Sequence, residues 1–123
     1  MPVDRGKIRR GTIVWAIVRD PRGFRKRRPA IILTPDAEIS DKEPIALMAI
    51  TTTYPDPAPK DHVELPWNPD RRRVSTGLAQ RSAAVVNWLD TVYLDEIEGI
   101  IGNVPTRLMR EIVDRLRQRD RIT

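Results

Sequence analysis

The stretch RGFRKRRPAIIL, residues 22–33, joins two different kinds of sequence without a spacer. Five of its first seven residues are cationic, and the remaining residues, PAIIL, are apolar and begin with a proline. Pro29 is tolerated at the first position of a strand, although it would remove a hydrogen bond from a strand interior. The stretch therefore predicts a charged loop over residues 22–27, followed by a buried strand that Arg28 opens.

Segments on either side of this stretch are short and rich in β-branched or aromatic residues, which is typical of strands. These further predicted strands are TIVWAIV (12–18), IALMAITTT (45–53), DHVELP (61–66), the segment 80–92, and GIIGNV (99–104). Turn- and proline-rich segments separate them, above all YPDPAPK (54–60) and WNPDRRRVSTG (67–77). The segment YLDEIE (93–98) predicts a single helical turn.

The C-terminal segment contains the clearest helix. Pro105 suits the first helical position, and one apolar stripe follows, formed by Leu108, Met109, Ile112, Val113 and Leu116. We expect this helix to fray after Gln118. The sequence thus predicts a mainly β fold with a C-terminal helix, in which five to seven strands form a small barrel with one or two short helices.

Length and composition narrow the classes of function. A chain of 123 residues predicts one domain, 1–123, whose ends at 1–6 and 119–123 we expect to be flexible. No apolar stretch approaches the roughly 20 residues that cross a bilayer, and the charged N-terminus does not resemble a secretory signal. With no cysteine and one histidine, disulfides and a Cys/His zinc site are excluded. We expect a cytoplasmic protein with no metal, no cofactor and no membrane partner.

The charge distribution points to a polyanionic partner. The formal net charge is +5, and basic residues gather at 5–10, 22–28 and 71–73 and along the C-terminal segment. An arginine presents five donors in a planar fork, so it can hold a phosphate and stabilise charge that develops in phosphoryl transfer. Arg28 opens one strand and Thr51–Thr53 close another, and we expect these strand ends on one rim. Composition alone favours the simpler interpretation of ordinary strand threonines and a solvated basic loop.

Taken together and in order, six segments resemble the MazF/PemK-type toxin endoribonuclease family of type II toxin–antitoxin systems, from Lys7 to about Leu116. The segments are GTIVWAIV, RRPAIIL, LMAITTT, DHVELP, GLAQRSAAVVNWLDTV and IGNVPTRLMREIVDRL. The resemblance implies an SH3-like barrel with a C-terminal helix, a homodimer, and sequence-selective, metal-independent cleavage of single-stranded RNA. It also implies neutralisation by a cognate antitoxin, a small protein whose extended C-terminal segment lies along the RNA groove.

The resemblance assigns catalysis to Arg28 and Thr51. The 2′-hydroxyl of the RNA would attack the adjacent phosphate and leave a 2′,3′-cyclic phosphate, so that no protein nucleophile is needed. Arg28 would stabilise the developing charge, and Thr51, with Thr52 beside it, would hold a phosphate oxygen. Ser82 matches a recurrent serine that lines the same groove.

Other predicted RNA contacts lie in loops. The resemblance implies that RGFRKR forms a mobile flap, in which four cations meet backbone phosphates: Arg22, Arg25, Lys26 and Arg27. Trp67 lies in a predicted loop, where an RNA contact and a loop-anchoring role are equally consistent with the sequence. His62, taken alone, indicates a surface or barrel-face residue.

The segment NWLDT departs from the family pattern. Trp88 and Asp90 stand where better-known members carry Gln and Arg. Trp88 could stack on a base, which is worth roughly 1–3 kcal/mol, although a tryptophan in an apolar strand is more often in the core or a dimer interface. These departures favour an alternative function: a non-catalytic homologue that binds nucleic acid or protein.

Two further alternatives have less support. Inhibition of a topoisomerase, as in relatives that poison DNA gyrase, does not need Arg28 or Thr51. An SH3-like adaptor would need a peptide groove lined by aromatic residues, which make up only 5% of the chain.

Overall fold

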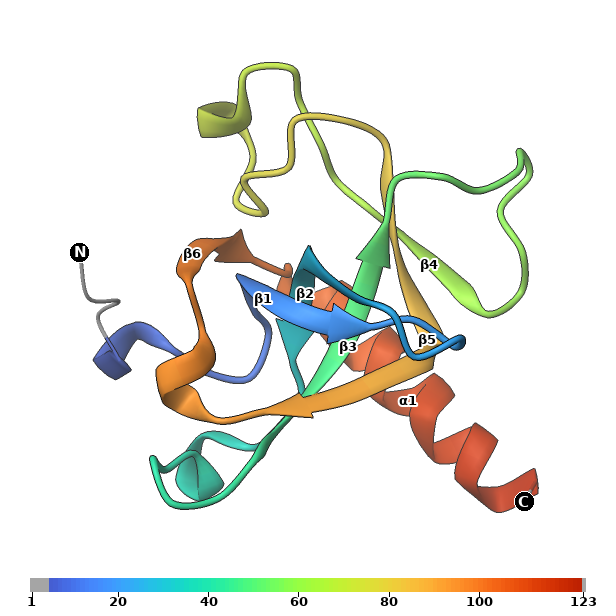
Figure 1. Cartoon of the computed structure of the whole chain (residues 1–123). Coiled ribbons are helices and arrows are strands. Elements are labelled where there is room, and N and C mark those ends of the chain that lie inside the picture. The colour runs from blue at the N-terminus through green and yellow to red at the C-terminus, as the bar shows by residue number, and fades with distance from the viewer. Residues whose placement is uncertain (1–4, 123) are drawn as a thin grey trace.

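The computed structural model describes residues 5–122, so part of the termini that we expected to be flexible, residues 1–4 and 123, lies outside the described residues. Six strands and one long helix follow one another along the chain (Figure 1). The strands are β1 (Thr12–Arg19), β2 (Arg25–Ile32), β3 (Ile45–Thr51), β4 (His62–Leu65), β5 (Ser82–Val92) and β6 (Gly99–Asn103), and the helix is α1 (Thr106–Ile122). One 3-10 turn, η1 (Arg5–Lys7), precedes β1, and three lie between strands: η2 (Asp36–Glu38), η3 (Arg71–Arg73) and η4 (Leu94–Glu96).

All six strands belong to one antiparallel sheet in the order β4-β5-β3-β2-β1-β6. The mainly β fold with six strands and a C-terminal helix is therefore confirmed. The two edge strands of this sheet, β4 and β6, are joined through the segment 75–78. Asn103 N–H donates to the Ser75 carbonyl at 2.8 Å, and Asn68 N–H, just after β4, donates to the Leu78 carbonyl at 3.0 Å.

The central strands are apolar in an unbroken run because both of their faces are buried. On β1, Ile13 packs in one core cluster and Val14 in a second, and on β2 Ile31 and Ile32 divide in the same way. Helix α1 covers the first cluster with its apolar stripe, in which Ile112 is fully buried. Such double burial produces continuous rather than alternating hydrophobicity, which is why these strands were recognisable from the sequence.

The loop predicted over 22–27 is wrong at its C-terminal half. Strand β2 begins at Arg25, which pairs with Arg19 at the end of β1. A tight hairpin turn makes this possible, because the Asp20 carboxylate accepts hydrogen bonds from the N–H groups of Arg22 (2.9 Å) and Phe24 (3.0 Å). Gly23 completes the turn with a φ of 88°.

Other boundaries moved by a few residues. Strand β3 ends at Thr51 instead of Thr53, and helix α1 continues to Ile122 instead of fraying after Gln118. Over residues 5–122, no helix combines the length and the apolar character needed to span a membrane.

Two glycines provide a matched test of how the sheet edges are joined. Gly77 (φ 68°) and Gly23 (φ 88°) both adopt the left-handed region, but a Cβ at Gly77 would collide with the Ile101 carbonyl, whereas one at Gly23 meets open space. We expect Gly23→Ala to cost about 1–3 kcal/mol of backbone strain and Gly77→Ala to cost clearly more, because the segment must also move away from β6. Urea unfolding of both variants measures the difference, and equal losses would contradict the close packing of this segment.

Candidate nucleic-acid interface

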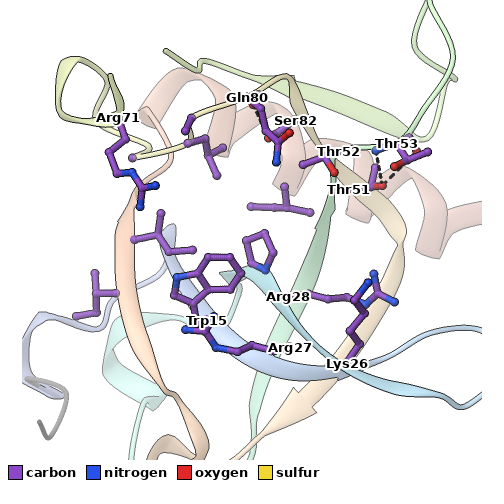
Figure 2. Close-up of a pocket in the computed structure, with 17 residues that line it drawn as sticks. Trp15, Lys26, Arg27, Arg28, Thr51, Thr52, Thr53, Arg71, Gln80 and Ser82 are labelled. Carbon is purple, nitrogen blue, oxygen red and sulfur yellow. Dashed lines mark hydrogen bonds between the residues drawn. The ribbon is translucent and has the colours of Figure 1, made fainter. Parts of the chain in front are cut away.

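A groove of about 520 Å³ opens at the ends of β2 and β3, between β6 and the segment that precedes β5 (Figure 2). Its lining includes four cationic side chains, and none of the described residues that line it is acidic. The charged and hydroxyl-bearing lining residues are Lys26, Arg27, Arg28, Arg71, Thr51, Thr52, Thr53 and Ser82. A concave surface with this excess of positive charge is suited to an anionic ligand.

Strand pairing brings Arg28 and Thr51 to the same side of this groove. The pairing of β2 with β3 ends at Ala30 and Ala49, and Arg28 and Thr51 each lie two residues beyond that last pair, at the same end of the two strands. Both residues line the groove, and Figure 2 shows the threonines on the same side of the opening as Arg28, with Arg71 on the other side. The expectation that these strand ends share a rim is met, while their catalytic roles stay predictions.

The hydroxyl of Thr51 is held by the backbone. It accepts a hydrogen bond from Thr53 N–H at 3.1 Å, and its own proton is directed to the Thr53 carbonyl at 3.2 Å. These two contacts end strand β3 and fix the Oγ1 atom at the groove. The hydroxyl therefore has a defined position before any ligand binds.

Arg28 is half-buried and carries an unusual set of contacts. Its guanidinium carbon lies 4.7 Å from the ring centroid of Trp88. Its Nε–H is buried and has no hydrogen-bond partner in the described part of the chain. Buried donors are normally satisfied, so this Nε–H is an exception. Among the described residues the guanidinium also forms no ion pair, so its terminal Nη groups can meet an acceptor oxygen where Arg28 lines the groove.

Arg27, the residue before Arg28 on β2, has different contacts. Its guanidinium carbon lies 4.3 Å from the centroid of Trp15, and its Nε is 3.6 Å from a carboxylate oxygen of Glu98. Trp15 is half-buried and lines the groove. The sequence did not identify Trp15 or Arg71 as site residues, although Arg71 belongs to one of the basic clusters.

The other predicted contacts fall into two groups. Lys26, Thr52 and Ser82 line the groove, although Ser82 is 1% exposed and its hydroxyl donates to the Gln80 carbonyl at 2.7 Å. Three further residues do not line it: Arg22 and Arg25, which lie in the hairpin, and Trp67, which is 45% exposed. His62 also lies outside the groove, half-buried, with its Nδ1 2.8 Å from the Asp61 carboxylate.

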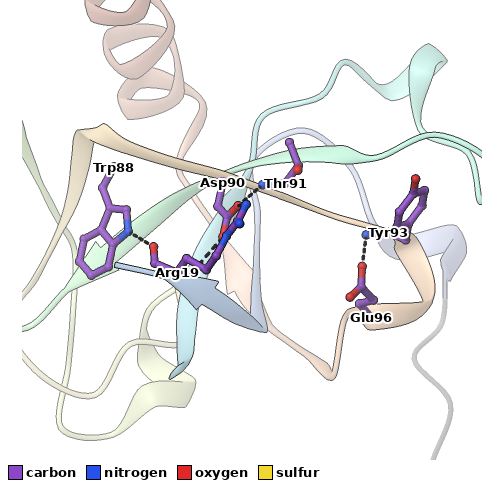
Figure 3. Close-up of polar contacts among 6 residues, drawn as sticks. All are labelled: Arg19, Trp88, Asp90, Thr91, Tyr93 and Glu96. Carbon is purple, nitrogen blue, oxygen red and sulfur yellow. Dashed lines mark hydrogen bonds and ion pairs between the residues drawn. The ribbon is translucent and has the colours of Figure 1, made fainter. Parts of the chain in front are cut away.

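Trp88 and Asp90 both contact Arg19 at the end of β1 (Figure 3). The Trp88 indole N–H donates to the Arg19 carbonyl at 2.7 Å, and its ring packs against the second core cluster. Asp90 accepts from the Arg19 N–H at 2.9 Å and from its guanidinium at 3.3 Å. Burial by itself would raise the pKa of Asp90, but hydrogen bonds from the Arg19 and Thr91 backbones and the Arg19 side chain outweigh it and lower the pKa.

Residues 9–119 match the family described as the PemK-like, MazF-like toxin of type II toxin-antitoxin systems. The chain belongs to this family. The search of curated proteins found no significant match to this chain.

Solved structures share its fold at low sequence identity. A MazE–MazF complex (Form-II) from Deinococcus radiodurans matches with a TM-score of 0.69 and 17% identity over 94% of this chain and 97% of that one. An endoribonuclease in complex with its cognate antitoxin from a Mycobacterial species matches with a TM-score of 0.65 and 19% identity, over 89% of this chain and 90% of that one. The Mycobacterium tuberculosis toxin MazF-mt6 matches with a TM-score of 0.57 and 18% identity, over 84% of this chain and 91% of that one.

The contacts of Asp90 predict a pH-dependent contribution to stability. Because the pKa of Asp90 is lowered from its ordinary value of 3.8, its carboxylate stabilises the fold above that value, and this contribution is lost as pH falls through the lowered pKa. Asp90→Asn should therefore lower the free energy of unfolding most near neutral pH, with a difference from wild type that shrinks in acid. Urea unfolding at several pH values measures this, with the exposed Asp41→Asn as control. A difference that stays constant with pH would contradict it.

Proposed function

We propose that this toxin-family protein is a sequence-selective endoribonuclease that cleaves single-stranded RNA without a metal ion. The observation that carries the proposal is a groove with four cations and no described acidic residue, lined both by the guanidinium of Arg28, which forms no ion pair among the described residues, and by the backbone-held hydroxyl of Thr51. Membership of the family supports the same function. RNA supplies both the phosphate that such a site would hold and the nucleophile that it lacks.

In the proposed reaction, the 2′-hydroxyl of one nucleotide attacks the phosphorus of the next phosphodiester and loses its proton. The bond from phosphorus to the 5′-oxygen breaks, and that oxygen gains a proton, which leaves a 2′,3′-cyclic phosphate and a free 5′-hydroxyl. Negative charge builds on the non-bridging oxygens as the phosphorane forms. Arg28 donates to these oxygens, and a guanidinium positioned in advance favours this charged state over the ground state.

Thr51 would contribute a second contact to the same phosphate. Its hydroxyl proton points to the Thr53 carbonyl in the free groove, and a small rotation would redirect it to a phosphate oxygen. The backbone N–H of Thr53 would continue to hold the Thr51 oxygen. The phosphate would then lie between a donor from β2 and a donor from β3.

Flanking nucleotides would bind along the rest of the groove. Lys26, Arg27 and Arg71 are exposed at its rim and would meet backbone phosphates. Trp15 offers a ring inside the groove, and base stacking on aromatic rings is the common way of holding unpaired nucleotides. Arg22 and Arg25 would act beyond the groove, as long-range attraction for the RNA.

The proposed partners follow the solved relatives. A MazF protein and a Mycobacterial endoribonuclease have each been crystallised with an antitoxin. We propose a cognate antitoxin for this chain, an extended segment of which occupies the cationic groove and competes with RNA. We also propose a cytoplasmic homodimer as the active form.

The first test of this function is cleavage in EDTA. Wild type should cut a long single-stranded RNA of mixed sequence and leave 2′,3′-cyclic phosphate ends, while Arg28→Ala should lower the rate at least about 100-fold, as expected for loss of a preorganised donor to the developing charge. Thr51→Ala should be slowed in the same direction. Mapping of 5′ ends and analysis of the new 3′ ends provide the measurement.

Arg107→Ala is the matched control, because it removes an equal charge from the exposed first turn of α1, away from the groove lining. It should cleave like wild type. If folded wild-type protein binds the RNA but leaves it intact, the endoribonuclease proposal is wrong and the non-catalytic alternative takes its place.

A second test concerns Arg71, which the structure adds to the predicted contacts. With an RNA that carries 2′-deoxy sugars and cannot be cut, Arg71→Ala should bind more weakly and lower the slope of log K against log salt by roughly 0.7. Binding titrations at four salt concentrations measure the slope. An unchanged slope would mean that Arg71 does not meet a phosphate.

A further inference from the structure

We propose that Trp88 is a positioning residue for Arg28 and that Asp90 acts through Arg19 to fix Trp88, an inference that rests on the proposed function of Arg28. The two departures from the family pattern would then form one device that prepares the catalytic arginine. This differs from the base-stacking role that the sequence allowed for Trp88. It also differs from a purely structural tryptophan in the core.

The first argument is where Trp88 lies relative to the groove. Trp88 is not among the residues that line it, whereas Arg28 is. The indole ring packs against the second core cluster, and the guanidinium carbon of Arg28 lies 4.7 Å from the ring centroid. Trp88 instead lines a separate hollow together with Arg19 and Asp90. Its contact with the cationic groove is therefore made through Arg28.

The second argument is that the ring itself is held in place. The Trp88 indole N–H donates to the Arg19 carbonyl at 2.7 Å, which fixes the rotation of the ring. The Asp90 carboxylate in turn holds Arg19 at two points: it accepts from the backbone N–H of Arg19 at 2.9 Å and from its guanidinium at 3.3 Å. Through Arg19, Trp88 and Asp90 join strands β1 and β5, which are not neighbours in the sheet.

The third argument concerns what Arg28 lacks. No carboxylate of the described residues forms an ion pair with Arg28, and its Nε–H has no partner. The contact with the indole face can hold the plane of the guanidinium by cation–π attraction without occupying its donors. A carboxylate in that position would instead consume the donors and the charge that a phosphate needs. An aromatic support is thus suited to an arginine that must stay available.

The kinetic test compares Trp88→Leu, Trp88→Phe and Asp90→Asn with wild type. The substrate is an oligoribonucleotide that contains the site first mapped on a long RNA. If Trp88 acts by positioning, Trp88→Leu should lower kcat by about 10- to 100-fold, because small misplacements of a reacting group have effects of that size, and should leave KM within about threefold. Trp88→Phe keeps an aromatic face and should recover part of the loss. Asp90→Asn should lower kcat less than Trp88→Leu.

Leu89→Ala is the matched control, since this neighbouring residue on β5 is exposed and its side chain points to the opposite face of the strand. It should have the kcat of wild type. The proposal is wrong if Trp88→Leu cleaves at the wild-type rate, or if Leu89→Ala loses as much activity. Trp88→Phe keeps the test decisive should Trp88→Leu fail to fold: a kcat equal to that of Asp90→Asn or higher supports the role, and complete loss with an intact fold contradicts it.

A spectroscopic measurement separates this inference from the proposed function. In a ¹⁵N spectrum, the Arg28 Nε–H resonance, assigned by its absence from Arg28→Lys, should be shifted upfield by the indole ring and exchange slowly in wild type. Trp88→Leu should remove both properties. If wild type cuts no RNA but the resonance behaves in this way, the endoribonuclease proposal fails and the placement of Arg28 by Trp88 stands. An unshifted resonance in wild type overturns the placement whatever the activity.

Discussion

The antiparallel pairing of β2 between β1 and β3 is the constraint on which the rest of the site depends. Strand β2 is charged at one end and buried on both faces at the other, so its register decides which arginine reaches which side. A slip of the register by one residue would exchange the faces to which Arg27 and Arg28 point. It would also move Ile31 and Ile32 each into the core cluster that the other now occupies. The apolar end of the strand, Ala30–Ile32, prevents such a slip because both faces of it are packed. Burial in the core thereby fixes the geometry of a group at the surface.

Cations gathered at one groove repel one another, and the contacts that offset this repulsion differ between Arg27 and Arg28. Arg27 has both an aromatic ring and a carboxylate, so its charge is partly compensated in the free protein. Among the described residues, Arg28 has only the ring of Trp88. Because a compensated arginine would have to break an ion pair before it held a phosphate, the two neighbours are suited to different tasks: Arg27 to contacts at the rim, and Arg28 to the reacting phosphate. This division is visible in the contacts and not in the run of letters RKRR.

The sequence predicted the elements well because burial and turn chemistry are local signals. All six strands and the helix were recognisable, and the main error, a loop where β2 begins, arose because Arg25–Arg27 carry no apolar signal. Their strand conformation is imposed by the Asp20 turn and by pairing with β1. Trp15 and Arg71 were missed for a related reason. They come from elements that are far apart in the sequence, and closure of the sheet through residues 75–78 brings these elements to the same groove.

Replacement of a cation by Asp90 raises the question of whether the groove has lost charge. The negative charge at Asp90 is directed to Arg19 and to two backbone N–H groups, and Asp90 does not line the groove. An anion satisfied in this way does little to lower the potential at Arg28. Trp88 likewise donates its one N–H to Arg19 and offers Arg28 only its ring face. The two departures from the family pattern are therefore coupled through a third residue, and together they leave the cationic groove intact.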